Sequence, residues 1–280
     1  MRTVHTKAAV RAEMAALRSR GGRIALVPTM GFLHEGHLSL VDRARQGADH
    51  VVMSIFVNPL QFAPGEDFER YPRDLERDSA LADARGADLI FAPPTDEVYG
   101  GADPDVQVVP GPMADRLCGA FRPGHFGGVL TVVAKLFNIL EPDVAVFGRK
   151  DFQQAVLIGR MTRDLDFPVE IDVAPIVREE DGLAMSSRNA YLSPQDRARA
   201  TCLYSGLDAA RKAFAEGERD AAALRDRVVT ALAARDVEPQ YVELVDPGTL
   251  DAVQRAAAGH VLAVAAFVGR TRLIDNMVME

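Results

Sequence analysis

Two histidines, His34 and His37, lie on either side of Gly36 within the segment Pro28–His37. The apolar run Ile24–Val27 precedes this segment, and the residues after it alternate between apolar and polar as in an amphipathic helix. The segment therefore indicates a strand, a glycine-containing loop and a helix N-terminus. A helix N-terminus presents unpaired N–H groups and the positive end of its dipole, which favour phosphate. Glycine has no Cβ, so the backbone can approach an anion closely. The two imidazoles, at i and i+3, lie on one face of the helix. We predict a phosphate-binding site here.

Other chemistry is compatible with the same two residues. A single histidine at such a place is usually a loop or core residue whose hydrogen bonds are made within the protein. A pair of histidines around a glycine favours phosphate binding instead. Zinc is the main rival, because imidazole is a common zinc ligand. A zinc site would require at least one further His, Cys, Asp or Glu to converge from elsewhere in the chain.

A second segment has the same order of strand, glycine and helix. An expected strand at residues 143–147 leads into Gly148-Arg149-Lys150-Asp151, and a helix is expected from Phe152 onward. Lys150 offers a point charge for phosphate. Asp151 suits either a helix cap or a contact with a ribose hydroxyl, and the plain cap is a strong alternative. Gln154 lies one turn into this helix, near the same strand end.

A third candidate is the polar, glycine-containing stretch that ends in Met185-Ser186-Ser187-Arg188. Hydroxyls and backbone N–H groups bind phosphate oxygens, and a guanidinium binds them in a fork. By itself this sequence is also typical of an ordinary surface loop. The presence of two other anion-binding segments in the same chain favours a triphosphate.

The elements needed to position these segments alternate between strands and helices. We predict strands at 50–57, 87–92, 143–147 and 169–177, and helices at 6–20, 75–85 and 129–140. Short connections between such elements are typical of a parallel α/β sheet, in which ligands bind beyond the carboxyl ends of the strands. Asn58 and Gln61 follow one of these ends. We therefore expect a Rossmann-like, doubly wound parallel sheet.

The composition changes near residues 176–190. Beyond that point we predict alanine- and arginine-rich helices at 194–215 and 221–234, followed by strands at 241–245, 261–268 and 271–279. We therefore expect two domains. Residues 1–176 form the Rossmann-like nucleotide-binding domain, and residues 177–280 form a smaller α+β domain that acts as a lid.

The chain's 280 residues are 48% hydrophobic and 26% charged, which is ordinary for a globular protein. A net charge of −8 gives no basic footprint for nucleic acid, so no nucleic-acid partner is expected. The first residues lack the apolar core of a signal peptide, and no run of eighteen apolar residues exists to span a membrane. Cys118 and Cys202 are far apart and form no CxxC pattern. We expect reduced thiols in a cytoplasmic protein.

A resemblance adds to these inferences. His34-x-Gly36-His37 is similar to the HxGH motif of the nucleotidyltransferase superfamily, and Met185–Arg188 is similar to the loop that closes over the triphosphate there. The match extends to one family, the pantothenate synthetases. Its motifs are found in order at residues 28–37, 56–62, 71–73, 122–126, 147–154, 181–189 and 273–276. The chain departs from the pattern at Arg149, where glutamate is common, and at Gly127, where arginine or alanine is usual.

The resemblance implies ATP-dependent condensation of pantoate with β-alanine through a pantoyl adenylate, with release of AMP and pyrophosphate. His34 and His37 would bond the phosphates, with His37 as proton donor. Lys150, Ser187 and Arg188 would neutralise the outgoing pyrophosphate. The residues that the family pattern assigns to ATP are Met30, Gly31, Phe32, Leu33, His34, Glu35, Gly36, His37, Gly148, Arg149, Lys150, Asp151, Val177, Met185, Ser186, Ser187 and Arg188.

The same resemblance assigns the acid substrate to neutral amides, namely Gln61, Gln154 and Asn58. Mg²⁺ is expected with ATP, and Asp78 is a candidate for an indirect contact with it. A homodimer is implied as well. Two other functions stay open at this stage: an adenylyltransferase of the same superfamily, which would need a second basic phosphate pocket, and a nucleotide-binding sensor without catalysis.

Overall fold

The computed structural model describes residues 1–102 and 104–280, and its contacts divide the chain into two compact units. Unit 1 comprises Met1–Ala114, Arg122–Arg149 and Leu157–Pro175. Unit 2 comprises Asp115–Phe121, Lys150–Val156 and Ile176–Glu280. One break thus falls between residues 175 and 176, and two short earlier segments pack with the C-terminal part. The division into functional domains at 1–176 and 177–280, with the second as a lid, stays a prediction.

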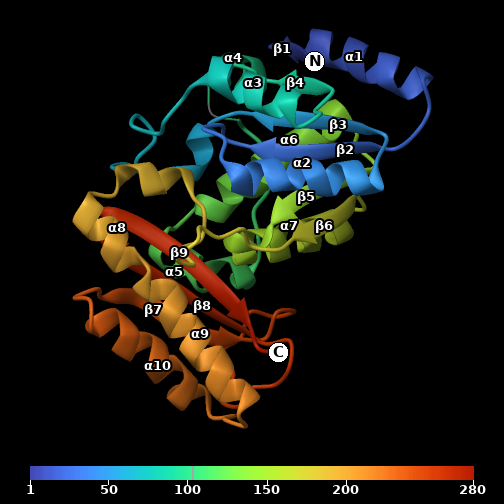
Figure 1. Cartoon of the computed structure of the whole chain (residues 1–280). Coiled ribbons are helices and arrows are strands. Elements are labelled where there is room, and N and C mark those ends of the chain that lie inside the picture. The colour runs from blue at the N-terminus through green and yellow to red at the C-terminus, as the bar shows by residue number, and fades with distance from the viewer. Residues whose placement is uncertain (103) are drawn as a thin grey trace. The chain divides into compact units, whose positions relative to one another are not determined.

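Unit 1 is built on a six-stranded parallel sheet with the strand order β1-β4-β3-β2-β5-β6 (Figure 1). Its strands are β1 (Arg2–Val4), β2 (Ile24–Thr29), β3 (His50–Ile55), β4 (Leu89–Phe91), β5 (Val144–Gly148) and β6 (Glu170–Ala174). The predicted doubly wound parallel sheet is confirmed. The edge strand β1 was not predicted, because three residues are too few to show a period.

The central strands are buried on both faces, which explains their continuous apolar sequences. Alternate residues of β2 and β3, such as Ala25, Val27 and Met53, pack with Leu38 and Val41 of a helix on one face. The residues between them are also fully buried and point to the other face. Burial of both faces fixes the register, because a slip of one residue would exchange the two sets.

Strand β2 is the point where the winding of the sheet reverses. It pairs with β3 on one side and with β5 on the other, and Leu26 is in register with Ala145. Counting three residues forward places the ends Thr29 and Gly148 at the same edge. Ligands of open α/β sheets bind at such a switch point. The segments after β2 and β5 are the first two that the sequence singled out.

The helices of residues 1–175 are α1 (Lys7–Ser19), α2 (Glu35–Gly47), α3 (Leu75–Ala84), α4 (Thr95–Tyr99), α5 (Cys118–Phe121), α6 (His125–Leu140) and α7 (Phe152–Asp164). Of these, α5 and the first turns of α7 belong to unit 2. Short 3₁₀ turns occur at Pro59–Gln61, Pro112–Asp115 and Arg149–Asp151. The predicted helices at 6–20, 75–85 and 129–140 are confirmed, although α6 begins earlier than predicted, at His125.

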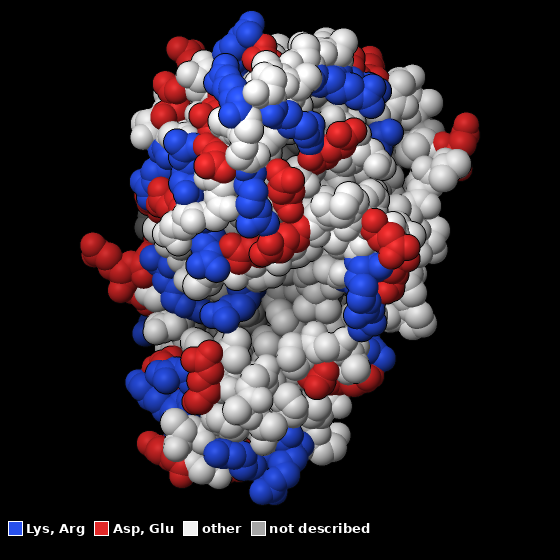
Figure 2. Space-filling view, turned by 90° about the vertical axis from the view of Figure 1, so that its right-hand side faces the viewer, with Lys and Arg blue, Asp and Glu red and all other residues white. Residues whose placement is uncertain are grey.

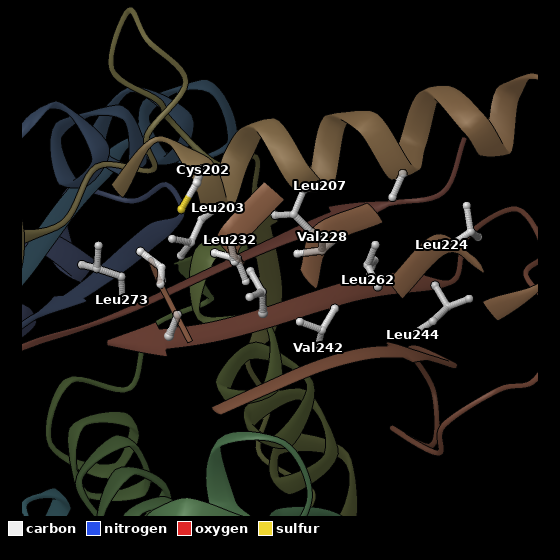
Figure 3. Close-up of a cluster of buried hydrophobic side chains, with 14 of the residues drawn as sticks. Cys202, Leu203, Leu207, Leu224, Val228, Leu232, Val242, Leu244, Leu262 and Leu273 are labelled. Carbon is white, nitrogen blue, oxygen red and sulfur yellow. The ribbon is translucent and has the colours of Figure 1, made fainter. Parts of the chain in front are cut away.

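Unit 2 contains an antiparallel sheet of β7 (Pro239–Val245), β8 (Val261–Val268) and β9 (Thr271–Val278). Helices α9 (Cys202–Ala215) and α10 (Ala221–Ala233) place leucines and valines against the sheet, as Figure 3 shows for Leu207, Val228 and Leu262. Each of these three side chains is fully buried. The smaller α+β part therefore has a hydrophobic core of its own.

The single helix predicted at 194–215 is wrong. The chain forms α8 (Pro194–Ala200) and α9 instead, with Thr201 between them. The hydroxyl of Thr201 donates to the carbonyl of Ala198 at 2.9 Å. Such a local bond competes with the helical ladder and bends or interrupts a helix. A further 3₁₀ turn, Ser187–Tyr191, precedes α8.

Acidic and basic side chains stand beside one another on the face shown in Figure 2. The ion pairs within unit 1 include Arg43 with Asp172 at 2.7 Å and Arg23 with Glu170 at 2.7 Å. Among the helices of the described residues, none is both long enough and apolar enough to cross a membrane.

Candidate active site

The two histidines stand at the start of α2. His34 is the N-cap residue, and its Nδ1 accepts a hydrogen bond from the Gly36 N–H at 3.1 Å. Because Nδ1 is an acceptor, the neutral ring carries its proton on Nε2, which is therefore a donor. His37 lies on the same helical turn, with 4.1 Å between the two ring centroids. The predicted helix N-terminus is confirmed, and the helix begins inside the motif.

A buried carboxylate fixes the turn before these histidines. Gly31 and Phe32 both have left-handed backbones, with φ of 82° and 50°, and such a backbone costs a non-glycine residue free energy. The N–H groups of Phe32 and Leu33 donate to the two oxygens of Asp78 at 2.6 and 2.7 Å. Burial raises the pKa of Asp78, while these two N–H groups lower it, and the net shift is upward. Asp78 thus holds the strained turn in place.

Close to this turn lies a cluster of amides. Gln61 donates from Nε2 to the sulfur of Met30 at 3.1 Å, and its Oε1 accepts from Asn58 Nδ2 at 3.1 Å. Asn58 also donates to the carbonyl of Gly128 and accepts from the Leu60 N–H and the Tyr99 hydroxyl. These four bonds use the whole amide of Asn58. In this arrangement Asn58 orients Gln61, and its direct contact with substrate stays a prediction.

The turn that carries Gln61 is pressed against helix α6. A Cβ at Gly128 would lie 2.2 Å from the carbonyl oxygen of Leu60, which no side chain can accommodate. This distance makes glycine necessary at position 128 while the turn keeps its place.

Arg122 and His125 then fix the carbonyl of Gln61. It accepts from His125 Nδ1 at 2.8 Å and from Arg122 Nη2 at 3.2 Å. Arg122 is paired in turn with Glu66. Burial raises the pKa of Glu66, but the hydrogen bond and charge of Arg122 lower it more, so the net pKa is below its ordinary value. His125 therefore has a positioning role here.

Unit 2 carries the other predicted segments. The 3₁₀ turn after β5 contains Lys150, whose Nζ lies 3.4 Å from the Asp151 carboxylate. The Lys150 side chain is 20% exposed. Gln154 is half-buried on the first turns of α7. A cation, a carboxylate and an amide therefore follow one another along this turn, as the sequence predicts.

The segment Ser186–Arg188 emerges from a tight hairpin. Met185 N–H donates to the carbonyl of Val177 at 3.0 Å, and the chain between them forms a bridge from Arg178 to Ala184. Ser186 then caps the 3₁₀ turn by accepting from the Arg188 N–H at 3.2 Å. Ser187 is buried, with 6% of its surface exposed. The hydroxyls thus sit on a structured corner, whereas an ordinary surface loop was the alternative.

The zinc alternative lacks a third ligand in the described part of the chain, where no three His, Cys, Asp or Glu side chains gather to hold a metal. Within unit 1 the structure brings together the histidine turn, Met30, Gln61, Asn58 and Asp78. Sequence reasoning missed the positioning roles of Glu66 and Tyr99. Nothing near them in the sequence signals those roles, because each acts on a residue from another element.

A family model described as pantoate-β-alanine ligase matches residues 2–278. The chain belongs to this family.

Two solved structures and one curated relative agree with that assignment. Pantothenate synthetase 1 of Bradyrhizobium diazoefficiens is 54% identical over 100% of this chain and 99% of its own. The crystal structure of pantothenate synthetase from Thermus thermophilus has a TM-score of 0.94 at 48% identity, covering 100% of this chain and 99% of that one. A pantoate-β-alanine ligase of Francisella tularensis, complexed with β-γ ATP and β-alanine, has a TM-score of 0.82 at 30% identity, covering 100% and 98%.

Members of this family are enzymes, and the fold matches theirs. One departure from the family pattern is explained by packing. A Cβ at Gly127 would meet the Val108 carbonyl at 3.6 Å and Pro110 at 3.9 Å, which are ordinary contacts. The packing at position 127 therefore tolerates a Cβ, and glycine is not required there. The arginine at position 149 is not explained by the contacts of its turn.

Proposed function

We propose that this enzyme condenses (R)-pantoate with β-alanine in an ATP-dependent reaction that yields pantothenate, AMP and pyrophosphate. The observation that carries the proposal is the full-length match to the pantoate-β-alanine ligase family, together with the histidine turn and the Gln61 amide at neighbouring strand ends of one sheet. The bound ligands of the Francisella tularensis relative, β-γ ATP and β-alanine, agree with it.

The chemistry requires two steps. A free carboxylate is a poor acyl donor, because attack by an amine would have to expel an oxide. In the first step a pantoate carboxylate oxygen attacks the α-phosphorus of ATP and the bond to pyrophosphate breaks. In the second step the β-alanine amine attacks the carbonyl of the mixed anhydride, the bond from this carbon to the AMP oxygen breaks, and the amine loses a proton. No oxidant or reductant is involved.

We assign the charge that builds up in the first step to the histidine turn. His34 donates from Nε2 to phosphate oxygens, and His37 acts as proton donor. One well-placed donor in such a site is worth about 3 kcal/mol of transition-state stabilisation. Because Asp78 and the N-cap already fix this turn, little reorganisation is needed when charge develops.

Residues of unit 2, together with Gly148, are assigned to the other parts of the nucleotide. Lys150, Ser186, Ser187 and Arg188 stabilise the outgoing pyrophosphate, which is a role for cations and hydroxyls. Asp151 and the backbone at Gly148 and Val177 bind adenosine. The carbonyl of Val177 already accepts from Met185. Its second lone pair is the one assigned to the nucleotide.

Pantoate is assigned to the amides. Gln61 and Gln154 bond its hydroxyls and carboxylate without adding a charge that would compete for phosphate. Met30 and Phe56 supply apolar surface for its dimethyl group, and both lie beside the Gln61 turn or β3 in unit 1. The pinned carbonyl of Gln61 supports this role, because a fixed backbone orients its side chain.

Mg²⁺ is proposed to accompany ATP, where it would neutralise charge on the phosphates. This ion keeps several waters and binds through substrate phosphates with one or two carboxylates. Both oxygens of Asp78 accept from backbone N–H groups, so only an indirect contact through water suits it. The donor chemistry of the chain fits an ion that arrives with the nucleotide and neutralises its phosphates.

We also propose that the enzyme is a homodimer located in the cytoplasm. The family resemblance supports the dimer, and two buried free thiols, Cys118 and Cys202, support a reducing compartment. Light scattering of the purified protein tests the first statement, with a monomer at micromolar concentration as the contrary result.

The decisive experiment is product analysis with ATP, pantoate and β-alanine. The proposal predicts an amide product together with AMP and pyrophosphate, and no ADP. If β-alanine is omitted, the amide must be absent. An adenylyltransferase would release pyrophosphate with a phosphorylated acceptor and form no amide. ATP binding measured by calorimetry, without AMP release in the complete mixture, would favour a sensor and overturn the proposal.

A further inference from the structure

Two consecutive polar residues of β9, Asp275 and Asn276, are almost completely buried. They are 2% and 3% exposed. The sequence marks them as part of the family-like ending Leu273–Asn276, yet the proposed reaction gives them no role. A buried carboxylate is costly unless it is paired and hydrogen-bonded. Their contacts therefore show what the fold uses them for.

Asp275 closes the hairpin that precedes Ser186. Its two oxygens accept from Arg178 Nη1 and Nη2 at 2.6 and 2.9 Å, a bidentate pair. Arg178 also donates to the carbonyl of Gly182 at 3.0 Å and stacks on the ring of Tyr204 at 4.5 Å. One guanidinium thus bonds the hairpin tip and β9 together.

The tip of this hairpin, at Gly182, packs tightly against the ring of Tyr204. Gly182 has a φ of 92°, and a Cβ there would lie 2.0 Å from Tyr204. The burial of Asp275 raises its pKa, and the charge and hydrogen bonds of Arg178 oppose that shift. Loss of either partner would leave the other charge buried alone. The hairpin is therefore anchored to β9 at one place by a strong pair.

The next residue of β9 holds the other phosphate segment. Asn276 Nδ2 donates to the backbone carbonyl of Lys150 at 3.1 Å. The N–H of Asn276 donates to Asp275 at 2.7 Å, so the two residues are also linked to each other. Within unit 2, adjacent positions of one strand therefore fix the Lys150 turn and the hairpin that leads to Ser186, Ser187 and Arg188.

We propose that Asp275 and Asn276 are positioning residues, which set the separation between the Lys150 turn and the Ser186–Arg188 segment for a triphosphate. This inference rests on the proposed function of those two segments. Neither residue is assigned a contact with substrate. They act through Lys150 and through Arg178, and rigid placement by supporting residues of this kind is what a preorganised site requires.

A double-mutant cycle between Asn276→Ala and Lys150→Ala tests the inference. The measured quantity is the steady-state rate of pyrophosphate release with ATP, pantoate and β-alanine all present. We expect Asn276→Ala to lower kcat about tenfold, with an increased KM for ATP and an unchanged KM for pantoate. Because Asn276 acts through Lys150, the double variant should be no slower than Lys150→Ala alone.

Met277→Ala is the matched control. Met277 is the next residue of β9 and packs against the same core, so its truncation also costs stability. We expect it to retain the kinetic constants of the parent enzyme. A kinetic loss in Met277→Ala as large as that in Asn276→Ala would mean that a weakened strand explains both, and would overturn the inference.

Further outcomes separate this inference from the proposed function. If Lys150→Ala is slow but Asn276→Ala is not, or if the two effects multiply in the double variant, the positioning role is wrong and the proposed function stands. If Lys150→Ala itself keeps the parent rate, the proposed role of Lys150 is wrong, and the inference falls with it. Asp275→Asn provides a second arm, which keeps the shape of the side chain and removes its charge. We expect this variant to raise the KM for ATP as well, and an unchanged KM would count against the role of the pair.

Discussion

The turn after β2 and the hairpin before Ser186 are both assigned to phosphate, but different forces hold them. Backbone N–H groups bound to Asp78 and the N-cap of His34 fix the turn, and the side chains it offers are imidazoles. Ion pairs fix the hairpin, namely Arg178 with Asp275 and Arg197 with Glu179 and Asp181. The first is a corner made rigid by hydrogen bonds, and the second is a corner made rigid by charge.

The difference has consequences for how each corner responds to change. Hydrogen bonds between buried groups are insensitive to salt, whereas the partly exposed ion pairs of Arg197 are screened by it. The turn after β2, held by hydrogen bonds, can keep a proton donor such as His37 in a fixed position. The hairpin before Ser186, held by ion pairs, can attract an anion and release it. The predictions below test this division of roles.

His37→Ala should give the largest effect. We expect adenylate formation, measured as pyrophosphate release from ATP and pantoate, to slow by about 10²-fold or more, because a proton donor at the reacting phosphate is lost. Circular dichroism should show an intact fold. His50→Ala is the control, since His50 lies in the same unit and its ring bonds the carbonyl of Gly21, away from the histidine turn. A folded His37→Ala enzyme with the parent rate would remove His37 from the mechanism.

Asp78→Ala should lower the free energy of unfolding by about 2 kcal/mol, because it leaves two buried N–H groups without their acceptors. Urea denaturation measures this change, and Asp83→Ala, an exposed position on the same helix, should have little effect. An indirect metal role predicts something else for Asp78→Asn. The Mg²⁺ concentration for half-maximal rate would rise in that variant. Its stability would fall as well, because the Asn NH₂ group would meet one of the two backbone N–H donors.

Arg197→Ala should have a smaller effect. Its bonds to Glu179 and Asp181 raise the pKa of Arg197 and lower that of Asp181, but the groups are partly exposed. Such pairs are worth about 0.2–1 kcal/mol. We expect about a threefold rise in the KM for ATP and a weaker salt dependence of that KM. Arg211→Ala, which breaks a similar pair with Asp208 on α9, should change neither. Equal salt dependence in both variants would contradict the charged-corner view.

Glu66→Gln should give the smallest effect and a defined pH dependence. The folded pKa of Glu66 lies below its ordinary value of 4.5. Its pairing with Arg122 therefore stabilises the fold above that ordinary pKa, and this contribution is lost as the pH falls through the folded value. Urea denaturation should show the parent more stable by no more than about 1 kcal/mol at pH 7. The difference should shrink toward zero below the folded pKa. Glu69→Gln, exposed on the same loop, should show no such change.

Much of the α/β part was predictable because its strands are continuous apolar runs ended by glycine or proline. The ends of β2, β3 and β5 could therefore be placed, and with them His34, Gln61 and Lys150. The start of α2 inside the motif was less evident, because histidine is not a common N-cap residue. The helix break at Thr201 was missed, because a threonine in an alanine-rich stretch does not by itself indicate that its hydroxyl will bond a nearby backbone carbonyl.

The residues that sequence reasoning left without a role are those that act across large sequence separations. Asp78 was considered only for a metal, because its bonds to Phe32 and Leu33 join α3 to a turn more than forty positions earlier. Asp275 reaches Arg178 in the same way. No local period or spacing encodes such pairs. They become visible only once the chain is folded.

The contact between Gly128 and the Leu60 carbonyl bears on how this enzyme can be recombined with its relatives. A chimera that imports α6 from another family member, but keeps its own residues 58–61, joins two surfaces that meet without a side chain between them. Any small shift of the foreign helix would move Gln61 as well. We expect the chimera to have an altered selectivity for the acid substrate, pantoate. The two segments should therefore be exchanged as one cassette.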